Sequence, residues 1–211
     1  MLVSLKDDFD TALALAKRAI QNDELVVYPT DTLYGLGCNA LSEKAVEKIY
    51  LAKERERGKP LSVLVASLAM AQQYCEISPS SLEILSEMLP GPYTFILPLK
   101  KGVSIPAAAG SKKIGIRFPD HFFMRTVSKV LNVPIVTTSA NISGEKSAST
   151  VDEVDASIKN ACTLIVDGGK TKYAEGSTVI DLVDKKILRH GAFATDFFSG
   201  KLAQFSDGGR V

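Results

Sequence analysis

Residues 25–32 are Leu25-Val26-Val27-Tyr28-Pro29-Thr30-Asp31-Thr32, an apolar run followed by a polar turn. The first four residues are β-prone and Pro29 stops the run, so the pattern predicts a strand that is buried on both faces. A helix is expected on each side of this strand. Residues 8–22 carry apolar side chains at the helical period behind a cap at Asp7 or Asp8, and Ser42 opens a second such run.

Strands and helices continue to alternate along the rest of the chain. Apolar, β-prone runs predict strands at residues 61–65, 93–97, 114–118, 135–136 and 164–166. Capping signals predict a helix after Ser78-Pro79, a helix from Asp120 through residue 131, and a short helix after the capping box Thr150-Val151-Asp152-Glu153. Residues 178–182 and 187–189 flank Asp184-Lys185 and predict a closing hairpin.

This order of elements predicts an α/β fold, built on a twisted, mixed, largely parallel open sheet with flanking helices. No repeat, composition break or low-complexity stretch divides the chain, so we expect a single domain over residues 1–198. Residues 199–211 are rich in Gly, Ser and Asp, and this composition predicts a frayed C-terminal tail.

Composition and charge exclude several classes of protein. The 211 residues carry 25 Lys and Arg against 24 Asp and Glu, so any site for a polyanion must be local. No apolar run approaches the roughly 20 residues that cross a bilayer, and residues 1–10 lack a secretory signal, so we expect a cytoplasmic protein without membrane contact. The three cysteines and two histidines form neither a disulfide framework nor a zinc signature, which leaves only Mg²⁺ held by oxygen ligands open.

Two stretches imitate nucleotide-binding motifs and fail on context. Gly35-Leu36-Gly37-Cys38-Asn39-Ala40 matches a dinucleotide fingerprint, but a six-residue loop separates it from the preceding strand, and the next strand does not end in the required acid. Gly169-Lys170-Thr171 imitates a P-loop, but Leu164 stands where that motif needs its first glycine. Neither motif is therefore assigned.

Residues 28–37 combine hydroxyl groups, a carboxylate and glycines at a strand end, where open α/β sheets place ligands; an ordinary turn is the alternative. The run from Lys53 to Pro60 holds four cations and two acids. On a continuing helix Lys53 and Arg57 would share a face, whereas a helix that ends near Lys53 would let Lys53 and Arg55 reach one pocket. The alternative for this run is a solvated helix end.

Two more segments carry polar groups. Residues 137–144 follow a predicted strand and offer small hydroxyl and amide groups, which bind ribose or phosphate oxygens or simply form turns. Residues 176–178 and 189–191 lie at opposite ends of the predicted hairpin, where His190 is either a general base or a structural histidine. The chain has no G-x-S-x-G nucleophile motif, so an enzyme of this sequence is expected to act by positioning and charge neutralisation.

Six short motifs, taken together and in order, carry a resemblance: Pro29-Thr30-Asp31-Thr32-Leu33-Tyr34-Gly35-Leu36-Gly37, Lys53-Glu54-Arg55, Gly91-Pro92-Tyr93-Thr94, Gly115-Ile116-Arg117-Phe118-Pro119, Thr138-Ser139-Ala140-Asn141, and Gly176-Ser177-Thr178 with Arg189. In these motifs the chain resembles the YrdC/TsaC family of threonylcarbamoyl-AMP synthases. The lysine-x-arginine and serine-x-asparagine pairs are the most specific parts. The length of the chain indicates the single-domain form.

The resemblance implies a YrdC-like fold with a wide basic concavity and a nucleotidyltransferase activity. Members of the family join L-threonine, bicarbonate and ATP, bound with Mg²⁺, into threonylcarbamoyl-AMP and release pyrophosphate. This is the first step of the tRNA threonylcarbamoyladenosine modification, and a partner transferase complex then modifies the tRNA.

The resemblance also implies roles for individual residues. Lys53 and Arg55 would be catalytic, because they would neutralise the charge on the departing pyrophosphate. The ATP site would comprise Lys53, Arg55, Lys59, Thr137, Ser139, Asn141, Ser147 and Arg189. The threonine site would comprise Thr32, Arg117 and Ser177, with Arg117 as a fork for the carboxylate. No protein side chain is assigned to a metal.

The chain departs from the family pattern at two positions: many relatives carry asparagine in place of Lys59 and histidine in place of Leu64. The latter change would remove a polar contact from the threonine pocket. Two alternatives stay open. One is a YciO-like module that binds double-stranded RNA or tRNA without synthase activity, and the other is a carbamoyl-transfer step like that of hydrogenase maturation proteins.

Overall fold

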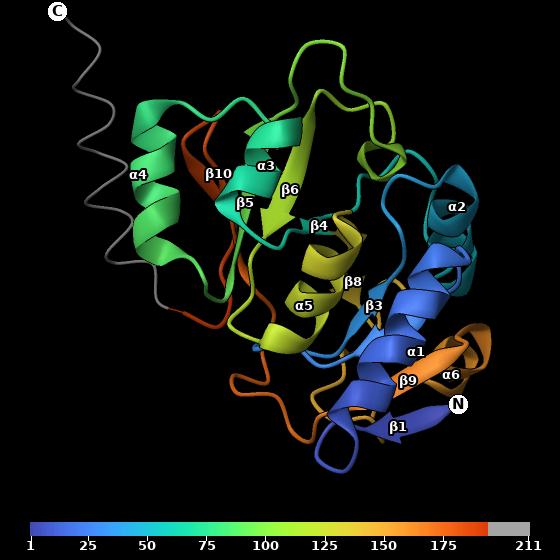
Figure 1. The fold of residues 1–211 in the computed structure, drawn as a ribbon. Coiled ribbons are helices and arrows are strands. Elements are labelled where there is room, and N and C mark those ends of the chain that lie inside the picture. Colours follow the sequence, from blue (N-terminus) through green and yellow to red (C-terminus); the bar gives the residue numbers. More distant parts are fainter. Residues whose placement is uncertain (194–211) are drawn as a thin grey trace, which may run out of the picture.

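The computed structural model describes residues 1–193 and divides their strands between two mixed sheets (Figure 1). The strands are β1 (Leu2–Ser4), β2 (Val26–Tyr28), β3 (Gly35–Gly37), β4 (Val63–Leu64), β5 (Tyr93–Pro98), β6 (Lys113–Arg117), β7 (Ile135–Val136), β8 (Thr138–Ser139), β9 (Leu164–Asp167), β10 (Thr178–Asp181) and β11 (Lys186–Arg189). One sheet has the order β1-β9-β2-β3-β8 and the other the order β11-β10-β5-β6-β4-β7. The tail expected at 199–211 lies outside the described residues.

The helices alternate with the strands as the sequence predicts. They are α1 (Phe9–Gln21), α2 (Glu43–Ala52), α3 (Leu68–Tyr74), α4 (Pro79–Met88), α5 (Phe122–Leu131) and α6 (Ala156–Ala161), with a 3₁₀ turn at Pro106–Ala108. Three predicted caps are confirmed: Asp8, Ser42 and Ser78 each accept a hydrogen bond from a backbone amide in the first turn of α1, α2 and α4.

The mixed α/β class is confirmed, but the strands do not form the single, largely parallel sheet that we expected. Parallel pairs such as β2 with β9 and β4 with β6 occur beside antiparallel pairs such as β2 with β3 and β5 with β6. The predicted hairpin of β10 and β11 is confirmed. The difference arises because β3 (Gly35–Gly37) and β8 (Thr138–Ser139) are short and contain no β-prone apolar run, so they could not be recognised as strands from sequence.

The two sheets meet where β3 passes β7. The amide of Val136 donates a 2.8 Å hydrogen bond to the carbonyl oxygen of Cys38, and Asn39 forms a bridge with Ile135. A Cβ atom on Gly37 would lie 2.5 Å from the carbonyl oxygen of Val136, so this approach requires glycine. Gly37 thus allows the two backbones to pack closely.

Two predicted helix starts are wrong. α5 begins after His121, which provides no side-chain cap, and the carboxylate of Asp120, the predicted cap, instead accepts from Nζ of Lys172 at 3.2 Å. The capping box at 150–153 does not open a helix: Glu153 accepts from Ser149, and α6 begins later behind Asp155. In each case a carboxylate of the predicted cap accepts a hydrogen bond from another group.

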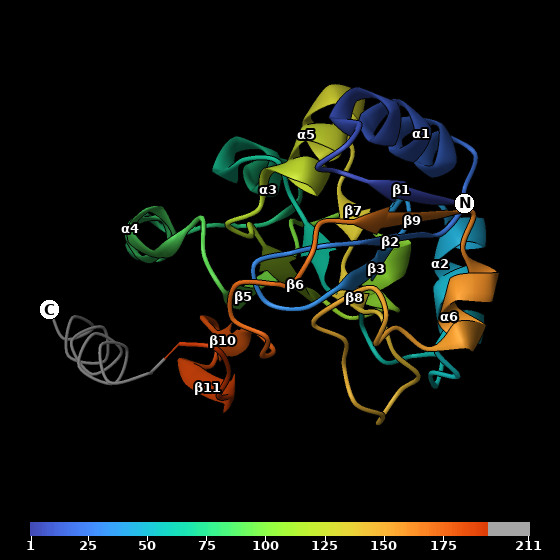
Figure 2. The same ribbon diagram turned by 90° about the horizontal axis from the view of Figure 1, so that it is seen from below.

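Figure 2 shows α1 and α5 along one side of the five-stranded sheet, and apolar clusters pack on both of its faces. Val26 and Tyr28 face a cluster built from α1 and α5, whereas Leu25 and Val27 face a larger cluster that includes residues of α2 and α6. The prediction that this strand is buried on both faces is confirmed. The same alternation places Val63 of β4 in the larger cluster and Leu64 in the cluster with α1 and α5.

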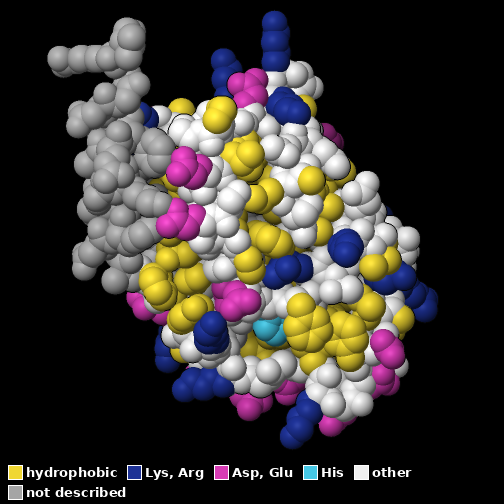
Figure 3. Space-filling model, turned by 60° about the vertical axis from the view of Figure 1, so that its left-hand side comes forward, with side chains coloured by type: hydrophobic (Ala, Val, Ile, Leu, Met, Phe, Trp, Pro, Cys, Tyr) yellow, Lys and Arg dark blue, Asp and Glu magenta, His cyan; other side chains and the backbone are white. Residues whose placement is uncertain are grey.

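On the face shown in Figure 3, the Lys and Arg side chains are interspersed with Asp and Glu, and neither sign forms a continuous area among the residues described. This agrees with the near-neutral composition of the chain. Within residues 1–193, no helix is long and apolar enough to span a membrane.

Candidate functional site

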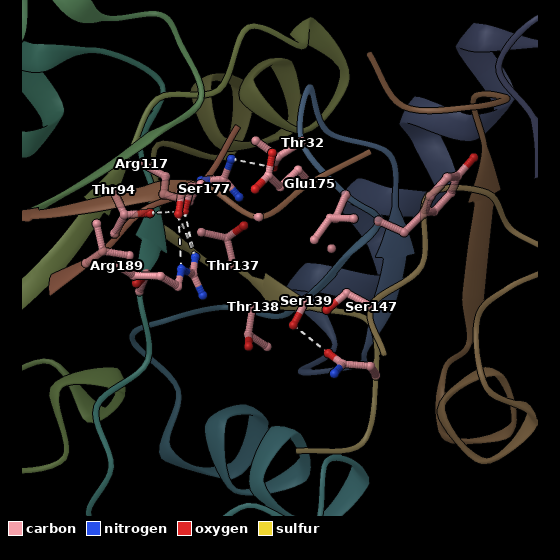
Figure 4. A pocket seen from close by; sticks show the side chains of 18 of the residues that line it. Thr32, Thr94, Arg117, Thr137, Thr138, Ser139, Ser147, Glu175, Ser177 and Arg189 are labelled. Atoms are coloured by element: carbon pink, nitrogen blue, oxygen red, sulfur yellow. Dashed lines mark hydrogen bonds between the residues drawn. The ribbon is translucent and has the colours of Figure 1, made fainter. Parts of the chain in front are cut away.

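A polar cavity of about 630 Å³ opens where loops from both sheets converge (Figure 4). Its walls come from the β2–β3 loop, the end of α2, the residues around β4, β5 and β6, the segment 137–147, and the segments that flank β10 and β11. Of the eleven predicted site residues, ten line it: Thr32, Lys53, Arg55, Arg117, Thr137, Ser139, Asn141, Ser147, Ser177 and Arg189. With Thr94, which also lines the cavity, the structure brings together residues from all six sequence motifs.

Lys53 connects the end of α2 to the segment 139–141. It is the C-cap of α2 and is 2% exposed, so its ammonium group points into the protein rather than into solvent. Nζ donates to the carbonyl oxygens of Ser139 and Asn141, both at 2.6 Å, and to Oδ1 of Asn141 at 3.2 Å. All three hydrogens of the ammonium group can be used by these acceptors.

The surroundings of Lys53 change its acidity. Burial, and to a smaller extent the nearby positive charge of Arg55, lower the pKa of Lys53 to about 8. No carboxylate pairs with this ammonium among the described residues, because its acceptors are carbonyl and amide oxygens. Lys53 is thus a buried cation that an incoming anion would stabilise.

The end of α2 at Ala52 decides between the two interpretations of the basic run. Beyond it, Arg55 turns into the cavity, donates to the carbonyl oxygen of Pro60 at 3.1 Å, and keeps a buried Nε without a hydrogen-bond partner. Arg57 lies outside the cavity and pairs with Glu47. A shared pocket for Lys53 and Arg55, with Arg57 excluded, is confirmed.

Lys59 is the predicted site residue that does not line the cavity. Its side chain is 60% exposed, pairs with Glu56 at 2.7 Å and does not line the cavity. Leu64 likewise does not line the cavity. It is fully buried in the apolar cluster of α1 and α5, so its substitution for histidine removes no polar contact from the cavity wall.

Arg117, at the end of β6, faces the β2–β3 loop. Its Nη2 donates to Oγ1 of Thr32 at 2.8 Å and to Oδ1 of Asp31 at 3.3 Å, while its Nε is buried without a partner. Burial lowers the pKa of Arg117, and the carboxylate of Asp31 opposes this shift. Arg117 is thus held through Nη2, at one edge of its guanidinium, and the guanidinium lines the cavity where a ligand carboxylate would bind.

Ser177 and Arg189 form a second polar group across the β10–β11 hairpin. Arg189 donates from Nε and Nη2 to the carbonyl oxygen of Ser177, at 3.1 and 2.8 Å, and from Nη2 to its hydroxyl at 3.1 Å. The same hydroxyl shares a 2.8 Å hydrogen bond with Oγ1 of Thr94. Figure 4 shows these residues on the same side of the cavity as Thr32 and Arg117.

Sequence reasoning assigned no role to several residues that line this cavity, among them Thr94, Lys146 and Glu175. Thr94 is a hydroxyl within the otherwise apolar strand run 93–97, and this signal could have identified it. Lys146 and Glu175 come from loops that carry no such signal. His190 also lines the cavity, at its end of the hairpin.

Positive charge dominates the cavity wall. Its lining residues include the five cations Lys53, Arg55, Arg117, Lys146 and Arg189 and a single carboxylate, Glu175. Covalent catalysis has little support there: burial raises the pKa of Cys38, Cys75 and Cys162, and none of the three lines the cavity. The arrangement can hold anions side by side and neutralise charge that develops between them.

The fold and this cavity define an α/β protein that binds anionic ligands on a wall of hydroxyl groups and cations. The chain belongs to the Sua5/YciO/YrdC family, since residues 18–191 match the model of that family, which is described as "Telomere recombination". The expected resemblance is thereby confirmed.

Individual relatives agree with this membership. The chain is 43% identical over 176 residues to a Methanocaldococcus jannaschii protein that is provisionally named a threonylcarbamoyl-AMP synthase, with 83% of each chain covered. It is 35% identical to the threonylcarbamoyl-AMP synthase of Pyrococcus abyssi, of which it spans 51%. The chain thus spans about half the length of this relative.

Solved structures show the same fold. The structure of P. abyssi Sua5 complexed with L-threonine superposes with a TM-score of 0.86 at 31% identity, covering 96% of this chain and 60% of that one. The structure of E. coli YciO superposes with a TM-score of 0.79 at 26% identity, covering 88% of this chain and 92% of the YciO chain.

Proposed function

We propose that this chain is an L-threonylcarbamoyladenylate synthase, which converts L-threonine, bicarbonate and ATP into threonylcarbamoyl-AMP and pyrophosphate. The observation that carries the proposal is the composition of one cavity. Arg117, Thr32 and Ser177 offer a guanidinium and two hydroxyl groups on one side, and Lys53 and Arg55 add cations at the end of α2. The names of the relatives and the threonine complex of P. abyssi Sua5 support the same assignment.

The reaction places two demands on the site. The amine of threonine and bicarbonate yield a carbamate, and an oxygen of this carbamate attacks the α-phosphorus of ATP while pyrophosphate leaves. Both reactants are anions, so the site must hold them together and neutralise the charge that grows on the pyrophosphate. Arg55 and Arg189 are placed to do this, because both line the cavity.

Lys53 contributes in a different way from the triphosphate clamp that we expected. Because its hydrogens are directed to Ser139 and Asn141, it fixes the segment that offers hydroxyl and amide groups to the nucleotide and adds positive charge from behind. Thr137 and Ser147 complete this part of the wall, and Figure 4 shows Ser147 beside Ser139.

Arg117 identifies the part of the cavity that would bind threonine. Its donors suit the carboxylate of threonine, and the hydroxyl groups of Thr32 and Ser177 suit the substrate hydroxyl. Mg²⁺ binds substrate phosphates and keeps most of its water ligands, so the protein needs to supply few ligands or none. If it supplies one, Glu175 is the carboxylate of the cavity wall that could do so. When bound with ATP, the metal neutralises phosphate charge.

The product places the protein in a sequence of reactions. Threonylcarbamoyl-AMP is an activated acyl phosphate, and a transferase complex consumes it to modify an adenosine of tRNA. We place this step in the cytoplasm. The five cations of the cavity would also suit RNA phosphates, and a module that binds double-stranded RNA or tRNA is the second candidate. Such binding would weaken steeply with salt and would not require threonine.

The test is pyrophosphate release by the purified protein with threonine, bicarbonate, ATP and Mg²⁺, and then with each substrate omitted. Release that requires all three substrates supports the synthase. The matched variants are Arg55→Ala, which removes a cation from the cavity, and Arg57→Ala, which removes one outside it. We expect a large loss only for the first. Binding of tRNA without pyrophosphate release would favour the RNA module instead.

A further inference from the structure

Asp31 is a buried carboxylate directly behind the amino-acid side of the cavity. Its side chain is fully buried, whereas that of Arg117 is 11% exposed. Oδ1 accepts from Nη2 of Arg117 at 3.3 Å and Oδ2 accepts from the amide of Asp120 at 2.9 Å. Its backbone carbonyl also accepts from the amide of Tyr173, which belongs to the segment leading to Ser177. Asp31 is therefore fixed from both sides.

Within residues 1–193, Arg117 is the only one of the five cations of the cavity wall that forms an ion pair with a carboxylate. Lys53 and Arg189 instead donate to protein oxygens that carry no charge. Arg55 donates to a backbone carbonyl. One continuous cavity thus contains a neutralised cation and several cations that are not neutralised.

This difference matters because the two substrates differ in charge. The triphosphate of ATP is strongly anionic and is attracted to any exposed cation, whereas free threonine is a zwitterion with no net charge. A cation paired with a fixed carboxylate keeps its hydrogen-bond donors but loses most of its long-range field. The carboxylate also repels a phosphate group that approaches the same guanidinium, and it favours the ammonium of an amino acid.

We propose that Asp31 determines specificity within the cavity: its charge makes the Arg117 pocket accept a zwitterionic amino acid and reject phosphate groups, which are left to the other cations. The inference rests on the proposed function, and it adds the way in which one basic cavity separates its two substrates. Asp31 acts through Arg117 and touches neither substrate.

The test uses Asp31→Asn, which removes the charge but keeps an oxygen that can accept from the amide of Asp120. Asp167→Asn is the matched control, since Asp167 accepts from Tyr34 at 3.1 Å and from the amide of Gly169 at 2.8 Å but pairs with no cavity cation. Threonine is titrated calorimetrically with and without saturating inorganic pyrophosphate. Circular dichroism establishes that each variant is folded.

In the wild type and in Asp167→Asn, pyrophosphate is expected to change the threonine affinity less than about threefold. In Asp31→Asn it is expected to weaken threonine binding by about tenfold or more, because an unneutralised Arg117 attracts the phosphate groups at short range. The double variant Asp31→Asn with Arg117→Gln should lose this extra pyrophosphate binding. If Asp31→Asn loses threonine affinity without gaining competition from pyrophosphate, Asp31 only holds Arg117 in place and the proposal is wrong.

A measurement on the wild type covers the case in which Asp31→Asn does not fold. The ligand 3-hydroxybutanoate resembles threonine without its ammonium group, and we expect it to bind at least about tenfold more weakly. Equal binding of the two ligands would overturn the proposal. Wild-type protein that binds no threonine at all would instead overturn the proposed function, so the two failures are distinguishable.

Discussion

Nζ of Lys53 lies 2.6 Å from the carbonyl oxygen of Asn141 and 3.2 Å from its side-chain oxygen. These residues are 88 positions apart in the chain, so a single ammonium group joins the end of α2 to the segment that follows β8. The side-chain amide of Asn141 in turn donates to the carbonyl oxygens of Ile142 and Glu145. Lys53 therefore supports the whole turn 139–145 from inside the protein.

Replacing Lys53 should damage stability and ATP binding together. Lys53→Met leaves buried carbonyl oxygens without a donor, at a cost of about 1–3 kcal/mol in the free energy of unfolding, and releases the turn that faces the nucleotide. Arg57→Ala removes only an exposed ion pair and should cost less than about 1 kcal/mol. Urea denaturation and calorimetric ATP titrations measure both effects. Equal losses of ATP affinity in the two variants would indicate a diffuse basic surface.

ATP binding should be linked to protonation of Lys53. The pKa of Lys53 is lowered to about 8, mainly by burial, so at pH 8 a large fraction of the side chain is neutral. Bound triphosphate favours the charged form, raises this pKa and draws a proton onto Nζ. We expect proton uptake on ATP binding near pH 8, with ATP affinity falling as the pH rises through 8. Titration calorimetry in two buffers of different ionisation enthalpy measures this uptake, and Lys53→Met should abolish it.

The same shift has a consequence for stability. Between pH 8 and the ordinary lysine value of 10.5, the unfolded state binds more protons at this position than the folded state does. The free energy of unfolding contributed by Lys53 therefore increases with pH across this window. For the ATP linkage described above, proton release instead of uptake at pH 8 would contradict the predicted rise of the pKa of Lys53 on ATP binding.

Leu64→His should destabilise the protein rather than improve threonine use. Many relatives carry a histidine in place of Leu64, but Leu64 is fully buried in an apolar cluster and does not line the cavity. An imidazole at this place loses apolar burial and has to find a hydrogen-bond partner, at a cost of about 2–5 kcal/mol. Leu51→His, at an exposed position of α2, is the control. Unchanged urea midpoints for both variants would show that the cluster accommodates the ring.

The parts of the fold that depend on local sequence could be predicted. The caps Asp8, Ser42 and Ser78 act on amides within one helical turn, and the alternation of residues 25–28 between two apolar layers follows from the strand geometry. The division into two sheets could not be predicted. It depends on short strands such as β4, in which Val63 pairs with both Ile116 and Val136, and nothing in the local sequence specifies these partners.

For the candidate site, the sequence predicted which residues line the cavity but not the contacts that they make. The family resemblance identifies ten residues that line the cavity, because its motifs mark polar groups at strand ends. The roles inside the site depend on contacts across the fold. Lys53 is committed to Asn141, Lys59 pairs with the neighbouring Glu56, and Asp31 neutralises Arg117. The contacts of Lys53 and Asp31 have no signal in the spacing of the residues, whereas Lys59 and Glu56 are only three positions apart.

The final prediction concerns the guanidinium of Arg117. Arg117→Lys keeps the positive charge and its attraction to Asp31, but a lysine cannot present two parallel donors to a carboxylate while it also contacts Thr32. The threonine concentration needed for half-maximal synthesis should therefore rise at least about tenfold. The ATP affinity should change little, because the cations Lys53 and Arg55 are untouched.

The control for this change is Arg125→Lys. Arg125 is a partly buried arginine that stacks on the ring of Phe118, with 4.0 Å between its Cζ and the ring centroid, and it lies outside the cavity. Threonine is titrated at saturating ATP and ATP is titrated alone, for both variants. If Arg117→Lys weakens ATP binding as much as it weakens threonine use, Arg117 belongs to the nucleotide side of the cavity. If Arg125→Lys has the same effect as Arg117→Lys, the loss arises from the packing around β6 and not from recognition of the carboxylate.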